Sequence, residues 1–142
     1  MKKILFVCVE NAGRSQMAEA FFRKYMSNGF EATSAGTKPS TQVNPIVLQA
    51  MKEIGMDIEN KTPKYLSSEM LNDSITVNMG CMDKESCPAL FVKDVLDWNI
   101  LDPKGKSIEE VRRIRDQIEI KIKELVKKIG EPSFGTDTLQ DT

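Results

Sequence analysis

The sequence lacks histidine altogether, and it contains only three cysteines. Without histidine the chain can form neither a Cys–His protease pair nor a serine triad that uses an imidazole base, and it has no histidine for a zinc site. An odd number of cysteines fits a disulfide-stabilised scaffold poorly and fits thiols that are kept reduced for chemistry. These absences leave thiol chemistry as the expectation, with no metal and no other cofactor.

An excess of charge of either sign is also missing. The chain has 20 basic and 21 acidic residues among 142, so its overall charge indicates neither a nucleic-acid nor an anionic membrane partner. No apolar run approaches the roughly 20 residues that span a bilayer. The first apolar run ends at Glu10, too early for the core of a signal peptide. We therefore expect a cytoplasmic protein without nucleic-acid or membrane partners, in which any anion specificity is local.

Strand-length apolar runs alternate along the chain with apolar residues at helical spacing. We predict strands at residues 3–9, 30–35, 74–79 and 92–98. We predict helices at residues 15–26, 44–55 and 107–129, and a shorter helical segment at 65–71. Strands separated by helices favour an α/β fold with an open, four-stranded, mostly parallel sheet and helices on both faces.

The last predicted helix closes the expected folded domain. Ser107 and Glu110 form a capping box at its start, and Asn44 stands at the N-cap of an earlier helix. The stretch 131–142 that follows contains Pro, Gly, Thr and Asp with almost nothing to bury. We expect residues 1–130 to form a single α/β catalytic domain and residues 131–142 a loose C-terminal tail.

The loop after the first predicted strand is the candidate functional site. Residues 8–15, Cys-Val-Glu-Asn-Ala-Gly-Arg-Ser, lead into a helix N-terminus, where backbone N–H groups and the helix dipole favour an anion. Arg14 offers two parallel donors to such an anion, and these positive surroundings favour the nucleophilic thiolate form of Cys8. We therefore predict that Cys8 attacks a phosphate-like oxyanion. The residues expected to bind this oxyanion are Val9, Glu10, Asn11, Ala12, Gly13, Arg14 and Ser15.

Two polar side chains of this loop have predicted supporting roles. The Ser15 hydroxyl can donate to the Cys8 sulfur or to the leaving group, and Asn11 can brace the loop by bonding its backbone. The alternative is that Cys8 is only a small buried apolar residue at the end of a strand, a common place for a free cysteine. The spacing between Cys8 and Arg14 favours the oxyanion loop.

The pattern Cys-x5-Arg-Ser, followed by Gln-Met-Ala-Glu-Ala at residues 16–20, resembles the low-molecular-weight tyrosine phosphatase superfamily, and most of all its thioredoxin-coupled arsenate reductase branch. The resemblance runs over roughly residues 3–129. It implies a phosphatase-like α/β fold and a general acid in a late Asp-Pro dipeptide, here Asp102-Pro103. Such an acid protonates the departing oxygen, which is a poor leaving group without its proton.

Two further cysteines distinguish the two activities found in this superfamily. A phosphatase needs only the first thiol, whereas reduction of arsenate to arsenite takes two electrons from the protein. By resemblance, Cys8 first forms an adduct with arsenate and Asp102 assists the loss of an oxygen. Cys81 then attacks the Cys8 sulfur as arsenite departs, and Cys87 attacks Cys81 and carries the disulfide outward to thioredoxin. The implied activity is arsenate reduction in arsenical resistance.

Two alternatives remain open. The first is phosphomonoester hydrolysis by Cys8, Arg14 and Asp102, although Lys104 and Gly105 stand where phosphatases tend to carry aromatic residues that hold a phenyl ring. The second is a redox or oxyanion sensor that signals by its disulfide. A sensor needs an output partner, and the sequence has no evident DNA-reading segment or long interaction tail.

Two positions differ from the family's pattern. Glu10 stands where this loop usually has a glycine, and its carboxylate either points to solvent or faces the pocket and repels the substrate. Asn11, Glu19 and Ser34 match three residues that hold a potassium ion in some reductases of this branch, and Lys64 stands in the place of the fourth, an aspartate. We expect the Lys64 ammonium group to replace that ion.

Overall fold

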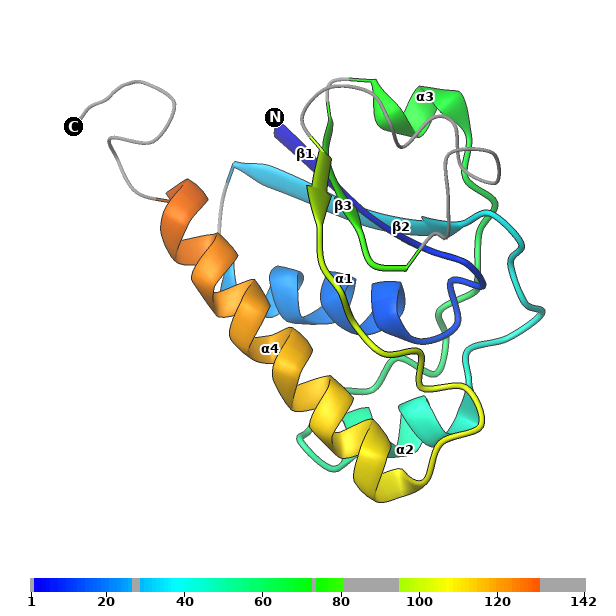
Figure 1. Cartoon of the computed structure of the whole chain (residues 1–142). Coiled ribbons are helices and arrows are strands. Elements are labelled where there is room, and N and C mark those ends of the chain that lie inside the picture. The colour runs from blue at the N-terminus through cyan, green and yellow to red at the C-terminus, as the bar shows by residue number, and fades with distance from the viewer. Residues whose placement is uncertain (1, 27–28, 73, 81–94, 131–142) are drawn as a thin grey trace.

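The computed structural model describes residues 2–26, 29–72, 74–80 and 95–130. Its sheet has the strand order β2-β1-β3-β4, and every strand pair in it is parallel (Figure 1). The strands are β1 (Lys2–Cys8), β2 (Phe30–Gly36), β3 (Ser74–Asn78) and β4 (Val95–Asp97). The helices are α1 (Arg14–Tyr25), α2 (Pro45–Lys52), α3 (Ser68–Leu71) and α4 (Ile108–Gly130). The predicted four-stranded α/β architecture is confirmed, and its sheet is parallel throughout.

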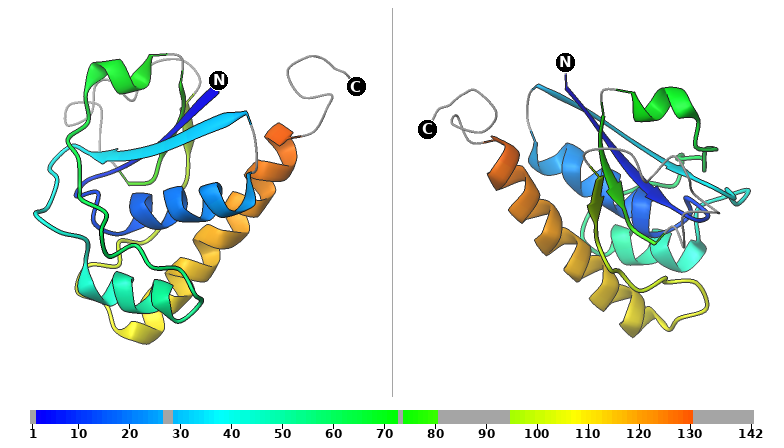
Figure 2. Two further views of the ribbon diagram at one scale, coloured as in Figure 1. Left: turned by 180° about the vertical axis from the view of Figure 1, so that it is seen from behind. Right: turned by 45° about the horizontal axis from the view of Figure 1, so that its top comes forward.

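Helices cover both faces of the sheet, but unequally (Figures 1 and 2). Successive side chains of β1 point to opposite faces, because side chains alternate along a strand. Ile4 and Phe6 join the larger core, which α1, α2 and α4 cover, whereas Leu5 and Val7 pack towards α3. Both faces of β1 are therefore buried, which explains why its sequence is a continuous apolar run rather than an alternating one.

Helix α4 crosses the larger core as one long amphipathic element. Its apolar residues recur at steps of three and four, as on one face of a helix. The buried ones are Val111, Ile114, Ile118, Ile122, Leu125 and Ile129. The capping box is formed, since the Glu110 N–H donates to Ser107 Oγ at 3.2 Å and the Ser107 N–H donates to Glu110 Oε1 at 3.3 Å. Within the described ranges, no helix combines the length and the apolar character needed to cross a membrane.

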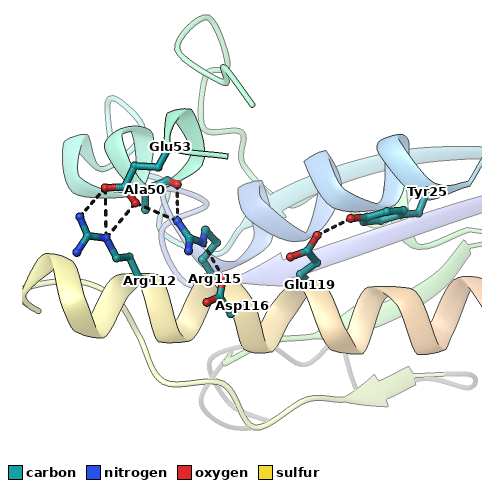
Figure 3. Close-up of polar contacts among 7 residues, drawn as sticks. All are labelled: Tyr25, Ala50, Glu53, Arg112, Arg115, Asp116 and Glu119. Atoms are coloured by element: carbon teal, nitrogen blue, oxygen red, sulfur yellow. Dashed lines mark hydrogen bonds and ion pairs between the residues drawn. The ribbon is translucent and has the colours of Figure 1, made fainter. Parts of the chain in front are cut away.

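Polar contacts attach α4 to α1 and α2 (Figure 3). Glu53, at the end of α2, accepts from Arg112 Nη2 at 2.6 Å and from Arg115 Nη1 at 3.1 Å. The Arg112 hydrogen bond holds the pKa of the Glu53 carboxyl below its ordinary value. On the other side, the Tyr25 hydroxyl of α1 donates to Glu119, and this bond raises the pKa of Tyr25 to about 12. The Glu53 contacts hold the end of α2 against α4, and the N-terminus of α2 lies beside the Cys8 loop.

The element boundaries differ from the predictions in a few places. Helix α2 ends at Lys52 rather than at residue 55, because the chain turns there and Gly55 adopts a positive φ of 81°. The helical segment predicted at 65–71 is confined to α3, and the described part of the predicted strand 92–98 is β4 at the edge of the sheet. The predicted tail 131–142 lies outside the described residues, so the domain boundary stays a prediction.

Candidate active site

The parallel sheet delivers Cys8 to the edge where ligands bind in open α/β folds. Cys8 is the last residue of β1 and is buried, and the chain then forms a short loop before α1 begins at Arg14. Strands β2 and β3 flank β1 in parallel, so their carboxyl ends meet at the same edge. Loops beyond this edge form the usual binding crevice of such sheets.

The segment 37–44 forms hydrogen bonds to the carbonyl groups of the loop after β1. Donors from the segment 37–44 reach four of these carbonyl oxygens over 2.8 to 3.3 Å. The donors are the N–H groups of Thr37, Lys38, Ser40 and Asn44, which bond the carbonyl oxygens of Cys8, Val9, Glu10 and Ala12. The C=O and N–H groups of one planar trans peptide point in opposite directions. The N–H groups of these peptide units therefore point away from the segment 37–44, an orientation that suits an anion on the opposite side of the loop.

Gly36 makes this arrangement possible, and the sequence analysis did not identify it. A Cβ atom at Gly36 would lie 2.5 Å from the Val9 carbonyl oxygen and 2.9 Å from the Asn11 nitrogen. Only glycine lets the end of β2 approach the Cys8 loop this closely. The available signal was the glycine at the end of the second predicted strand, which reads equally well as an ordinary strand end.

The Cys8 sulfur is part of a buried hydrogen-bonded chain. Its Sγ atom lies 2.9 Å from Ser15 Oγ, and Ser15 Oγ accepts from Asn11 Nδ2 at 2.7 Å. Because the serine oxygen already accepts from Asn11, its own proton is available for a thiolate at Cys8. The structure thus brings Ser15 to the place where its predicted role requires it.

Asn11 braces the loop with its whole side chain. It adopts a positive φ of 51°, a conformation that asparagine tolerates better than most residues. Its Oδ1 atom accepts from the Lys64 N–H at 2.8 Å and from Gln16 Nε2 at 3.2 Å. Gln16 Nε2 also donates to the Asn11 carbonyl oxygen at 3.1 Å, and its side chain is buried. Gln16 is a supporting residue that the sequence analysis missed, and its only signal was a polar residue among buried positions of α1.

Arg14 links the Cys8 loop to the segment that carries Asp102. Its Nη1 donates to the Ile100 carbonyl oxygen at 3.0 Å, and its Nη2 lies 3.5 Å from Asp102 Oδ2. The guanidinium group rests against Gly80, where a Cβ atom would overlap Nη1 and lie 2.9 Å from Nη2. Gly80 also has a φ of +135°, which other residues rarely adopt. Both the close contact with Arg14 and the backbone conformation therefore require glycine at this position.

The structure brings together the predicted residues Cys8, Arg14 and Asp102. All three border one pocket, together with Glu10, Ala12, Gly13, Asn44, Pro103 and Lys104. Pro103 packs closely against the loop, since a Cβ atom at Gly13 would lie 2.7 Å from Pro103 Cγ. Cys81 and Cys87 lie outside the described residues, so their predicted roles stay predictions.

The structure places Glu10 at the border of the pocket, in contact with a lysine. Its Oε2 atom accepts from Lys104 Nζ at 2.8 Å, and both side chains stand at the border of the same pocket. This hydrogen bond raises the pKa of Lys104 above its ordinary value. The carboxylate is therefore matched by a cation instead of facing the pocket alone.

The prediction for Lys64 was wrong. Glu19 is buried and accepts from Ser34 Oγ at 2.6 Å, from Arg23 Nε at 3.0 Å and from Lys61 Nζ at 3.5 Å. Lys64 is exposed, and it contacts the loop through its backbone N–H. Arg23 and Lys61 therefore supply the positive charge next to the carboxylate. Among the residues described, no three Cys, Asp or Glu side chains gather in a way that could hold a metal ion.

Comparisons with known proteins give the family. An arsenate reductase of Brevibacillus brevis is 38% identical over 128 residues, which are 89% of this chain and 95% of the relative. A thioredoxin-dependent arsenate reductase of Corynebacterium glutamicum superposes with a TM-score of 0.76 at 35% identity, over 92% of this chain and 62% of that one. The YwlE arginine phosphatase of Geobacillus stearothermophilus superposes with a TM-score of 0.81 at 26% identity, over 92% and 94%.

A family model gives the same answer for nearly the whole described domain. The model for low molecular weight phosphotyrosine protein phosphatases matches residues 3–133, a range that contains the Cys8 loop, Arg14 and Asp102. The two superpositions above, each over 92% of this chain, agree with this match. The chain therefore belongs to the low molecular weight phosphotyrosine protein phosphatase family.

Proposed function

We propose that the protein reduces arsenate to arsenite by a relay through Cys8, Cys81 and Cys87, with thioredoxin as the reductant. The observation that carries the proposal is the 38% identity to an arsenate reductase along almost the full length of both chains. It is supported by two cysteines beyond the one that a phosphatase needs. A relay of reduced thiols also fits a cytoplasmic location, where thioredoxin keeps thiols reduced.

In the first step, the Cys8 thiolate attacks arsenic and forms a sulfur–arsenic bond. The loop amides and Arg14 hold the remaining oxygens, and the Ser15 hydroxyl, 2.9 Å from the sulfur, stabilises the thiolate beforehand. Asp102 gives its proton to the departing oxygen, which leaves as water. The half-exposed Asp102 borders the same pocket as Cys8, and this position supports that role.

In the following steps, electrons pass from the thiols to arsenic. The Cys81 thiolate attacks the Cys8 sulfur, a Cys8–Cys81 disulfide forms, and the electron pair of the sulfur–arsenic bond goes to arsenic, which leaves as arsenite. The Cys87 thiolate then attacks Cys81, forms a Cys81–Cys87 disulfide and releases Cys8 as a thiolate. The dithiol of thioredoxin reduces this second disulfide and is itself oxidised, so two electrons reach each arsenate.

Turnover with arsenate, thioredoxin and thioredoxin reductase tests the proposal. Replacing Cys8 by serine removes the nucleophile and ends all turnover. Cys81→Ser and Cys87→Ser end multiple turnover of arsenate and leave hydrolysis of p-nitrophenyl phosphate in place. Peptide mass mapping identifies a Cys8–Cys81 disulfide in Cys87→Ser. Continued thioredoxin-dependent turnover by either of these two serine variants would show that the relay is wrong.

A second candidate function is phosphomonoester hydrolysis by the same loop. It is favoured by the match of residues 3–133 to the family model for low molecular weight phosphotyrosine protein phosphatases. In that case the phosphoryl group is transferred to Cys8 and then to water, and Asp102 acts first as acid and then as base. Steady hydrolysis without arsenate turnover, unaffected by Cys81→Ser and Cys87→Ser, is the result that favours this alternative.

A further inference from the structure

An ion pair crosses the border of the Cys8 pocket. Glu10 lies in the loop after β1, and Lys104 lies 94 residues later, directly after Asp102-Pro103. Glu10 Oε2 and Lys104 Nζ are 2.8 Å apart, and both residues border the pocket that contains Cys8 and Asp102. The pair therefore joins the side of the pocket that holds the nucleophile to the side that holds the acid.

Both ends of this pair are attached to a fixed backbone. The Glu10 carbonyl oxygen accepts from the Ser40 N–H at 3.0 Å. The Lys104 N–H donates to Asp102 Oδ1 at 3.0 Å, and the preceding Pro103 is buried against Gly13. The two side chains consequently meet because their main chains are held at a set separation.

We propose that the Glu10–Lys104 pair, called here the rim pair, restricts the pocket to free tetrahedral oxyanions and disfavours phosphate monoesters. This inference rests on the proposed function, because it takes the Cys8 pocket to be the place where an oxyanion reacts. It adds the substrate class, inorganic oxyanions without an organic substituent, and names the two residues that determine it.

The chemistry of the two substrate classes gives the reason. In a monoester, the leaving oxygen faces Asp102 and carries the organic group, which has to pass Asp102 and Lys104 to reach solvent. A free oxyanion has only a hydroxyl at that position. Glu10 and Lys104 both border this pocket, and their side chains are in contact next to Asp102. An aryl group on the Asp102 side therefore competes with the Glu10–Lys104 contact for the same border of the pocket.

Electrostatics adds to this steric effect. A carboxylate beside an oxyanion loop repels the bound anion, and Lys104 compensates the charge of Glu10 while the two are in contact. When an organic group separates them, the Glu10 carboxylate loses its partner next to an anion. While the rim pair is intact, the Glu10 carboxylate therefore weakens the binding of small oxyanions only slightly. It weakens the binding of esters more, because an ester separates the pair.

Binding of inorganic phosphate and of phenyl phosphate, measured by calorimetry, tests the proposal in the full chain with Cys8→Ser, which prevents hydrolysis. The readout is the ratio of the two dissociation constants, because both ligands present the same phosphate group. We expect phenyl phosphate to bind at least about tenfold more weakly than phosphate in this parent protein. Glu10→Gln and Lys104→Gln each lower the ratio, by up to about fivefold, the upper end for an exposed ion pair. The double variant lowers the ratio no further.

Reversing the pair with Glu10→Lys and Lys104→Glu restores the ratio of the parent protein, because the contact is rebuilt with opposite polarity. Lys52→Gln is the matched control, since it removes one lysine from an exposed pair with Glu59, whose atoms are 3.4 Å apart. This control leaves the ratio unchanged. A parent ratio near one, no detectable binding of either ligand, single variants that keep the parent ratio, or a reversed pair that behaves like the single variants would each overturn the proposal.

Arsenate turnover in the chain with Cys8 intact separates this inference from the proposed function. One outcome is that thioredoxin is oxidised in the presence of arsenate while substitutions of Glu10 and Lys104 leave the ratio of dissociation constants unchanged. In that case the proposal for the rim pair is wrong and the proposed function stands. If arsenate is not reduced but these substitutions change the ratio of dissociation constants as described, the proposal for the rim pair stands and the proposed function is wrong.

Discussion

Asn11 connects three parts of the site at the level of a single side chain. Its amide donates to Ser15, its carbonyl oxygen atom Oδ1 accepts from Lys64 and Gln16, and its backbone takes a left-handed conformation. All of these groups except Lys64 are buried. Buried donors that lose their acceptor pay the full cost of desolvation, so the geometry next to Cys8 depends strongly on this residue.

Asn11→Ala removes these hydrogen bonds and puts a less suitable residue at φ 51°. We expect the free energy of unfolding to fall by about 2 kcal/mol, and kcat/KM to fall as Ser15 loses its orientation. Asn11→Gly is the matched control, because glycine accepts the positive φ, so the difference between the two variants isolates the backbone strain. Urea unfolding measures the stability, and an alanine variant as stable as the wild type would contradict the expectation.

Gly80 has a comparable influence on Arg14, although it carries no functional group. Gly80→Ala forces the guanidinium group away from Gly80, and it disturbs the contacts of Arg14 with Ile100 and Asp102. A misplaced oxyanion ligand can cost about 100-fold in rate, and we expect a loss of kcat/KM of that order.

Gly55→Ala provides the control for Gly80→Ala. Gly55 also has a positive φ, of 81°, but a Cβ atom there would meet nothing within 4 Å. Both substitutions strain the backbone, so both lower the melting temperature, whereas only Gly80→Ala lowers kcat/KM. An equal effect of the two variants on the kinetics would mean that Arg14 is not displaced.

At the scale of elements, the contacts of Glu53 couple α2 to α4. This matters for the site because Asn44, the N-cap of α2, bonds the Ala12 carbonyl oxygen of the Cys8 loop at 2.9 Å. The helix cap and the Glu53 contacts hold the two ends of α2. Its position is consequently determined by both the loop and α4.

Because the pKa of Glu53 is lowered in the folded protein, we expect the free energy of unfolding to depend on pH in the acidic range. The Arg112 hydrogen bond lowers the pKa of Glu53 in the folded protein below its ordinary value of about 4.5, so the folded state favours the ionised form more than the unfolded state does. The resulting stability is present above pH 4.5 and is lost as the pH falls through the lowered pKa.

Glu53→Gln therefore destabilises the protein at neutral pH, and its difference from the wild type narrows in acid. Thermal unfolding between neutral pH and about pH 3 measures this difference. Glu59→Gln serves as the control, since Glu59 belongs to an exposed pair on one short stretch of chain and does not connect helices. A difference that stays constant with pH would show that the Glu53 contact does not depend on ionisation.

At the scale of the whole molecule, the site exists because parallel strands end at one edge. The loop after β1 and the segment after β4 come from distant parts of the sequence, and Arg14 and the rim pair join them. A ligand held between them contacts both parts of the fold at once. Binding an oxyanion should therefore stabilise the entire domain against unfolding.

Inorganic phosphate is expected to raise the melting temperature. At a phosphate concentration 100 times the dissociation constant, the free energy of unfolding increases by about 2.7 kcal/mol. Arg14→Lys keeps the charge but lacks the planar pair of donors, so the same phosphate concentration stabilises this variant less. Differential scanning fluorimetry with phosphate, and with chloride at equal ionic strength, measures the effect. An identical response of wild type and Arg14→Lys would contradict bidentate binding by Arg14.

Local patterns were sufficient for the elements of the fold and for the centre of the site. The spacing of apolar residues predicts the strands and helices, and the caps at Asn44 and Ser107 form as expected. Alternation of strands with helices predicts a parallel sheet, and such a sheet brings Cys8 and Asp102 to one edge. Each of these features depends on neighbours in the chain or on connection order, both of which are written directly in the sequence.

Only the tertiary structure decided which side chains meet across the site. Lys61 rather than Lys64 approaches Glu19, and Glu10, at the border of the pocket, pairs with Lys104. Gly36 and Gly80 prove to be required by close approaches of Val9 and Arg14. These contacts depend on the distances between separate elements after packing, and residue spacing along one chain carries no information about such distances.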